Sequence, residues 1–170
     1  MKEINIISRT NLFETFNYEI YFDDKFYNGI CSPTSFISNL LIEKKPSPLK
    51  IIVSNNNKEI FNIYKVYKTP LNNSIYTISF FNKEYAVLEA NNFKIPDFLI
   101  ETDFGNLEIS GTVSSGQYTI TLLNNIVANI SSKKTKDSKE YTIYHNLDFN
   151  NSSELLISAT LIIDSLYHYY

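Results

Sequence analysis

Few residues in this chain have the type and spacing that catalysis requires. The two histidines, His145 and His168, and the single cysteine, Cys31, stand far apart in the sequence. Zinc needs three or four closely arranged ligands, and this set offers no such spacing. We expect Cys31 to be a small buried hydrophobe. A nucleophilic Cys–His pair stays open as an alternative until the fold is known.

The four glycines form no recognisable phosphate-binding or nucleophile motif. Gly111 and Gly116 enclose Thr-Val-Ser-Ser, but this spacing differs from a Gly-x-Ser-x-Gly nucleophile elbow, and the segment has the pattern of a β-hairpin. We therefore predict no catalytic residues, no metal ligands and no cofactor. The sequence does not indicate an enzyme.

One basic cluster could bind an anion. It contains Lys133, Lys134, Lys136 and Lys139. Near an anionic membrane each lysine contributes about 1 kcal/mol, so these four are the candidate residues for a lipid headgroup. The alternative is a solvated hairpin loop, or a sheet edge that lysines guard against aggregation. We favour the solvated loop.

Acidic and amide side chains gather before the last element of the chain. Asp148, Asn150, Ser152 and Glu154 alternate as in a calcium loop, but no glycine occupies the sixth position and no glutamate the twelfth. Helix capping explains this segment better, and we predict no calcium site.

Asp164 lies inside an apolar stretch. A buried carboxylate must be paired, hydrogen-bonded or protonated. We expect this stretch to be a helix inside a β-barrel, as argued below. Asp164 would then anchor the helix to backbone amides of the surrounding strands, or lie as a charge near the mouth of the helix.

Composition limits the class of protein. The chain has 170 residues, a net charge of −3, and 15 basic against 18 acidic residues, which disfavours binding to nucleic acid. No apolar run reaches the ~20 residues of a membrane-spanning helix, and the N-terminus lacks the pattern of a signal peptide. One cysteine suits a reducing compartment. We expect one cytoplasmic domain over residues 1–170, from a bacterium with an AT-rich genome, because 14 of the 15 basic residues are lysine.

A period of two dominates the sequence. Tyr18, Ile20 and Phe22 alternate with more polar residues, as on the two faces of a half-buried strand. Asparagine-rich turns follow such runs about every 8–12 residues, which is typical of a sandwich or barrel, here of ten to twelve strands. We expect residues 33–48, which hold three prolines, to form a loop and an edge strand. Nine further segments alternate in the same way: 49–53, 60–66, 75–81, 85–89, 98–102, 107–113, 117–122, 126–130 and 141–145.

The end of the chain breaks this pattern. Asn151 and Glu154 predict the start of a helix over residues 155–166 that is apolar nearly all round and must therefore be buried nearly all round. At about 1.5 Å per residue the helix spans roughly 20 Å, short of the ~30 Å hydrocarbon layer of a bilayer. The interior of a β-barrel accommodates it better. Its predicted core residues are Leu155, Leu156, Ile157, Leu161, Ile162, Ile163 and Leu166.

The C-terminal half resembles the tubby C-terminal-like superfamily, which includes the LURP-one-related proteins, their small bacterial relatives and, distantly, the phospholipid scramblases. The resemblance lies in the order of five segments: 93–109, 117–121, 127–134, 140–143 and 154–164, the last ending in Ile163-Asp164. It implies a closed antiparallel barrel of about twelve strands threaded by the C-terminal helix. It also implies binding, to phosphoinositides in tubby, or calcium-dependent lipid movement in scramblases.

Neither lipid activity transfers residue by residue. The paired basic residues of tubby have no match here, and the position of the scramblase calcium segment falls on residues 148–151, which are poor in carboxylates. The sequence thus predicts a non-enzymatic binding module that docks a lipid headgroup or other ligand on its outer face, peripherally at a membrane in the first case. The alternative is a structural or protein-interaction subunit that uses exposed tyrosines, including Tyr167, Tyr169 and Tyr170.

Overall fold

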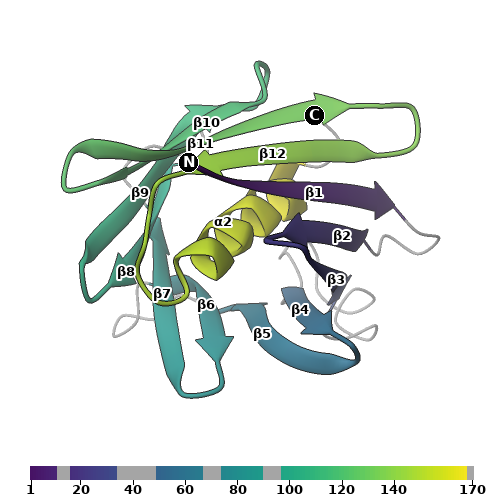
Figure 1. The fold of residues 1–170 in the computed structure, drawn as a ribbon, viewed down its shortest axis with the longest axis horizontal. Helices are drawn as coiled ribbons and strands as arrows, with labels where there is room; N and C mark the ends of the chain where they lie inside the picture. The colour runs from purple at the N-terminus through teal and green to yellow at the C-terminus, as the bar shows by residue number, and fades with distance from the viewer. Residues whose placement is uncertain (11–15, 34–48, 67–73, 90–96, 168–170) are drawn as a thin grey trace, which may run out of the picture.

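Twelve antiparallel strands close into a barrel around one helix (Figure 1). The computed structural model describes residues 1–10, 16–33, 49–66, 74–89 and 97–167. The strands are β1 (Lys2–Thr10), β2 (Phe16–Phe22), β3 (Lys25–Pro33), β4 (Leu49–Asn55), β5 (Lys58–Lys65), β6 (Ser74–Phe80), β7 (Lys83–Glu89), β8 (Phe98–Thr102), β9 (Gly105–Thr112), β10 (Gln117–Leu122), β11 (Asn125–Lys134) and β12 (Lys139–His145), followed by α2 (Ser152–Tyr167).

Each strand pairs with its neighbours in sequence, and β1 closes the barrel by pairing with β12 from Lys2↔His145 to Ser8↔Lys139. Five two-residue turns lie at one end, called here the tight-turn end. The opposite end, where α2 terminates, is called the helix-exit end. Strands β1, β3, β5 and β7 terminate at the helix-exit end, and residues 11–15, 34–48, 67–73 and 90–96, which come after them in the sequence, lie outside the described residues.

Several tight turns use the left-handed backbone that a two-residue β-hairpin favours. Asp23 and Asp24 have φ of 53° and 57°, and Asn56 and Asn57 have φ of 49° and 63°. Asparagine and aspartate tolerate this conformation better than other residues with a side chain. The chain therefore builds tight turns with few glycines.

The core is the space between α2 and the inner faces of the strands. Every residue from Leu155 to Ile163 is at most 2% exposed, and the strands contribute an alternating inner set such as Ile4, Ile6 and Ile20. Two hydroxyls within the buried helix bond back to the preceding turn: Ser158 Oγ donates to the Glu154 carbonyl at 2.8 Å, and Thr160 Oγ1 to the Leu156 carbonyl at 2.9 Å. These serine and threonine hydroxyls can thus be buried with α2 and still have hydrogen-bond partners.

α2 starts where its sequence predicts. The Leu155 amide donates to the Asn151 carbonyl at 2.9 Å, which makes Asn151 the cap, and Glu154 occupies the third helical position. Asn151 has a φ of 61°, a value that asparagine tolerates. Negative charge in the first turn also interacts favourably with the helix dipole.

The predicted barrel and buried helix are confirmed, with three differences. Leu166 is 42% exposed, so it does not belong to the core, because the last turn of α2 emerges from the barrel. The strands β1 and β3 were not among the segments that alternation identified. The predicted loop and edge strand fall largely on residues 34–48, outside the described residues.

The dependence of the fold on the filled interior can be measured with two isoleucines. Replacing Ile162, fully buried in α2, by alanine leaves a cavity and should lower the free energy of unfolding by about 2–5 kcal/mol. The same change at Ile126, which is 62% exposed, should alter it by no more than about 0.5 kcal/mol. Urea denaturation compares the two. Equal losses would contradict the burial of α2.

Candidate functional site

A buried polar cluster surrounds Asp164 near the helix-exit end. Ser8 Oγ of β1 donates to Asp164 Oδ2 at 2.6 Å, and the Tyr141 hydroxyl of β12 donates to Asp164 Oδ1 at 2.8 Å. Ser8, Tyr141 and Asp164 are at most 1% exposed. Hydrogen bonds to a charged acceptor are stronger than neutral ones. These two bonds tie the last helix to the first and last strands.

Other titratable side chains adjoin this carboxylate. Burial and the nearby Asp164 raise the pKa of Tyr18 well above its ordinary value and that of Cys31 to about 12. Burial lowers the pKa of Lys139, while Asp164 opposes that shift. The Lys139 ammonium also lies 5.6 Å from the centre of the Tyr141 ring. The protons on Tyr18 and Cys31 therefore stay in place at neutral pH.

Strand parity explains why these residues meet. Ser8 follows Ile4 and Ile6 on the inner face of β1, and Lys139 and Tyr141 precede Ile143 on the inner face of β12. Glycine makes room for a tyrosine ring: Gly29 pairs with Tyr18, and a Cβ at Gly29 would lie 3.0 Å from the Tyr18 Cβ. The inner sets of β1, β2 and β12 thus end in polar or aromatic side chains at the helix-exit end.

The Asp164 cluster is suited to anchoring rather than to turnover. A reacting group needs access to substrate, and Tyr18, Cys31 and Asp164 are each 1% exposed. The expectation that Asp164 anchors the helix agrees with its contacts, although the two acceptor contacts described are to side-chain hydroxyls instead of backbone amides. Cys31 is a free, buried cysteine, as expected.

The histidines are not brought into this cluster. His145 is 1% exposed, and its Nε2 lies 3.4 Å from Ser153 Oγ at the start of α2. Burial, followed by the charge of Lys2, lowers the pKa of His145. His168 lies outside the described residues. The described part of the chain contains no group of three His, Cys, Asp or Glu side chains placed to hold a metal ion.

The four candidate lysines differ in exposure: three are exposed and one is buried. Lys133, Lys134 and Lys136 are exposed at the hairpin that joins β11 to β12, as the sequence indicates. Lys139 is only 3% exposed, so its assignment to an outer anion-binding patch is wrong. The physical reason is parity, because Lys139 belongs to the inward set of β12 together with Tyr141 and Ile143.

The segment proposed and rejected as a calcium loop is accounted for by the helix start. Asp148 Oδ1 accepts from Lys2 Nζ at 3.1 Å, and this pair is solvent-exposed. Asn151 caps α2. Among the described helices none combines the length and apolar character needed to cross a membrane.

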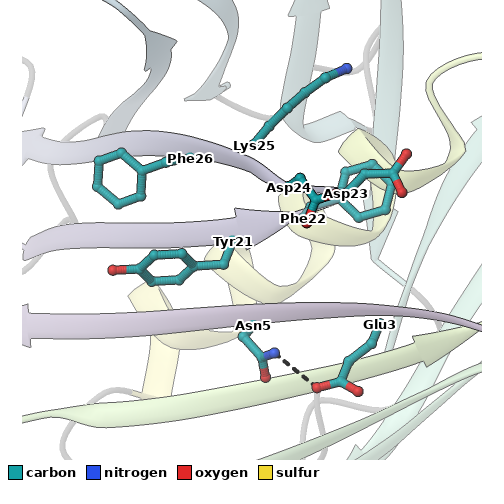
Figure 2. Close-up of a pocket in the computed structure, with 8 residues that line it drawn as sticks. All are labelled: Glu3, Asn5, Tyr21, Phe22, Asp23, Asp24, Lys25 and Phe26. Atoms are coloured by element: carbon teal, nitrogen blue, oxygen red, sulfur yellow. Dashed lines mark hydrogen bonds between the residues drawn. The ribbon is translucent and has the colours of Figure 1, made fainter.

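A surface hollow lies on the outer face of the first three strands (Figure 2). Its volume is about 370 Å³. Tyr21 and Phe26 stand on neighbouring strands with ring centres 5.2 Å apart and ring planes at 47°. In Figure 2 they project to the same side, whereas Asp23 and Asp24 stand at the turn. The β2–β3 hollow, as it is called here, is lined by Glu3, Asn5, Tyr21, Phe22, Asp23, Asp24, Lys25 and Phe26.

The sequence reasoning did not find this hollow. Its rings belong to positions that are 43% and 42% exposed, at Tyr21 and Phe26. Phe26 and Ile30 face outward on β3, while the inward positions between and beside them include Gly29 and Cys31. The exposed apolar residues Phe26 and Ile30, which alternate along β3, were the sequence signal that could have indicated this hollow.

The comparisons with known proteins give no match. No protein-family model matches this sequence, and no similar protein was found among curated proteins or among solved structures.

Removing the buried acceptor tests the anchoring role. Asp164→Ala leaves the hydroxyls of Ser8 and Tyr141 without this acceptor and should lower the free energy of unfolding by about 3 kcal/mol. Asp148→Ala removes an exposed ion pair and should cost less than about 1 kcal/mol. Chemical denaturation of both variants measures the difference. A loss at Asp164 no larger than that at Asp148 would disprove the anchor.

Alkaline pH should destabilise the fold through the raised pKa values of Tyr18, Tyr141 and Cys31. These groups keep their protons in the folded state after the unfolded chain has lost them. Their contribution is therefore complete below the unfolded pKa values of 9.0 to 10.0 and is lost as pH rises above them. Lys139, whose pKa is lowered, acts in the opposite direction up to pH 10.5.

Cys31→Ala isolates one of these groups. Between pH 9 and 12 the variant should lose stability less steeply than the parent chain, by one proton, or about 1.4 kcal/mol per pH unit. Urea denaturation at a series of pH values gives both slopes. Parallel curves would show that the thiol titrates normally in the fold.

Proposed function

We propose that this chain is a non-enzymatic binding module that works through its outer surface. The supporting observation is the filled barrel: the side chains of α2 from Leu155 to Asp164 occupy the interior, and each is at most 2% exposed. Barrels that carry a ligand inside leave room for it. In this chain α2 takes that place, so a ligand would bind on the outside.

The ligand we propose first is an anionic lipid headgroup at the β11–β12 hairpin. Lys133, Lys134 and Lys136 are exposed there, next to Asp137 and Glu140 of opposite charge. Lysines close to an anionic surface contribute about 1 kcal/mol each. Three lysines therefore predict weak, salt-dependent attachment at the periphery of a membrane.

We also propose kinship with the tubby C-terminal-like superfamily. Two features support this: a closed twelve-strand antiparallel barrel, and an apolar C-terminal helix in its interior. Headgroup binding is a property that this kinship implies. The lysines of the β11–β12 hairpin would be the residues that carry it here.

A second candidate is a protein-interaction subunit. Large apolar side chains are exposed at three tight turns, with exposed fractions of 98% for Phe81, 56% for Phe104 and 71% for Leu123. Leu123 adopts a φ of 50°, a conformation unfavourable for leucine. Large apolar side chains exposed at neighbouring turns of the tight-turn end favour a contact surface there.

Vesicle sedimentation tests the headgroup proposal. The parent chain should bind vesicles with 30% phosphatidylserine at low salt and release at 0.5 M salt, since exposed charges are then screened. The triple variant Lys133→Gln, Lys134→Gln, Lys136→Gln should reduce binding at least tenfold. The matched control is Lys25→Gln, Lys50→Gln, Lys58→Gln on β3 to β5, which should bind within twofold of the parent. Equal binding by both triple variants would refute a role for the hairpin.

A further inference from the structure

The turns of the tight-turn end fall into a polar set and an apolar set. The β2–β3 and β4–β5 turns consist of polar residues, two aspartates at 23–24 and two asparagines at 56–57. Each of the next three turns carries a large exposed apolar side chain: Phe81, Phe104 and Leu123, called here the apolar rim. These three hairpins follow one another around the barrel, along the left and lower edges of Figure 1. The tight-turn end is thus amphipathic.

Contacts between the turns join the apolar rim into one surface. Lys83, which directly follows the β6–β7 turn, forms an ion pair with Asp103 of the β8–β9 turn. Leu123 of the β10–β11 turn lies against Gly105, where a Cβ would be 3.2 Å from the Leu123 Cδ2. The three apolar side chains therefore lie on one connected part of the surface.

Leu123 has a residue type that its turn does not favour. It has a φ of 50°, and the same first turn position is occupied by Asp23, with a φ of 53°, and by Asn56, with a φ of 49°. Such turns prefer asparagine, aspartate or glycine, because these residues tolerate the left-handed backbone. Leu123 is also 71% exposed, so it keeps most of its apolar surface in solvent. An unfavourable conformation combined with high exposure points to a contact outside the fold.

The apolar rim carries no net charge. Its three turns contain one charged side chain, that of Asp103, and the ion pair with Lys83 neutralises it. The other polar members of these turns are Asn82 and Asn124. A contact made by this surface should therefore depend little on salt, because salt screens charges.

Shape and size favour a lipid surface as the occupant. The three side chains stand at the tips of hairpins, so a rigid partner would need a pocket to match each tip, whereas a bilayer interface deforms around them. A stable protein–protein interface buries about 800 Å² per partner. One aromatic side chain buries about 150–250 Å², so the three side chains of the apolar rim fall short of that area. Binding to a bilayer interface instead scales with whatever apolar area is buried.

We infer that the apolar rim inserts into the interfacial layer of a bilayer of uncharged, zwitterionic lipid, with the acidic β2–β3 turn left in water. This inference goes beyond the headgroup proposal, because the β11–β12 hairpin lies at the opposite, helix-exit end and acts through charge. It also gives the apolar turns an occupant different from the protein partner of the second candidate above.

The chain contains no tryptophan, so a single introduced tryptophan reports on its own surroundings. Phe81→Trp places one at the most exposed tip, and Ile30→Trp, at a position 55% exposed on the outer face of β3, is the matched control. Vesicles of phosphatidylcholine alone are added at 0.5 M salt, up to 10 mM lipid. The emission of Phe81→Trp should shift to the blue by at least 10 nm and be quenched by brominated phosphatidylcholine. The emission of the control should shift by less than 3 nm.

Vesicle flotation with the same lipid measures the affinity. Phe81→Ser with Leu123→Asn should weaken binding at least tenfold, because burial of apolar surface drives it. The matched control is Phe26→Ser with Ile30→Ser, which removes two exposed apolar side chains from the wall of the barrel and should change binding less than twofold. Binding of the parent chain should differ by less than twofold between 0.1 and 0.5 M salt.

The choice of substitutions keeps loss of binding separate from loss of folding. Phe104 is left in place, because its ring packs on that of Phe149 with the ring centres 4.8 Å apart. Leu123→Asn introduces the residue type that the β4–β5 turn uses at the same position. The melting temperature of the Phe81/Leu123 variant should therefore be no lower than that of the parent chain.

Three results would overturn the inference. They are absence of binding to phosphatidylcholine vesicles, equal losses in the two double variants, and a blue shift of Phe81→Trp that rises with protein concentration without lipid. The last result would assign the apolar rim to a second copy of the chain.

Failure of this inference and failure of the headgroup proposal are separate results. The triple variant of the hairpin lysines should keep full binding to neutral vesicles. The Phe81/Leu123 variant should keep the salt-dependent binding to anionic vesicles. That sedimentation test uses about tenfold less lipid, at which the weak attachment of three apolar side chains contributes little.

Discussion

The barrel depends on having α2 inside it. A twelve-stranded sheet closed on itself encloses more space than its own inward side chains fill, and an empty apolar interior would forfeit packing contacts. Residues 155–163 supply the missing volume from a single helix, with each residue at most 2% exposed. Closure of the sheet and burial of the helix therefore stabilise each other, and neither element has a partner for its apolar surface without the other.

The Asp164 cluster fixes how the helix sits within this space. Apolar packing alone is not directional, so a helix that is apolar on nearly every side could rotate or slide at small cost. The hydroxyls of Ser8 and Tyr141 bind the two carboxylate oxygens at 2.6 and 2.8 Å and thereby select one position. Burying a carboxylate is costly, but removing one member of a satisfied buried set costs more. The Asp164 cluster therefore fixes the position of α2 relative to the inner faces of the strands.

Much of the fold could be predicted from local pattern, because alternation and an all-apolar helix leave few arrangements. The strands β1 and β3 were harder to predict from the sequence. On β1 the inward series ends in Ser8, and on β3 the inward series includes Gly29 and Cys31 while Phe26 and Ile30 face solvent. Inward and outward positions alternate in both strands, but the small and polar members of the inward series conceal this pattern in the sequence. The β2–β3 hollow was missed and Lys139 was assigned to the wrong face for the same reason. Both depend on which face of its strand each side chain occupies.

The closure of the sheet has a consequence for the order of assembly. Lys2 pairs with His145, and Ser8 meets Asp164, across 143 and 156 positions of sequence. During synthesis the first strand must wait with one edge unpaired until nearly all of the chain has left the ribosome. Contacts this distant in sequence slow folding, and unpaired strand edges invite association with other chains. The interval between emergence of β1 and arrival of α2 is thus when the nascent chain is most vulnerable to aggregation, and when a chaperone would help it most.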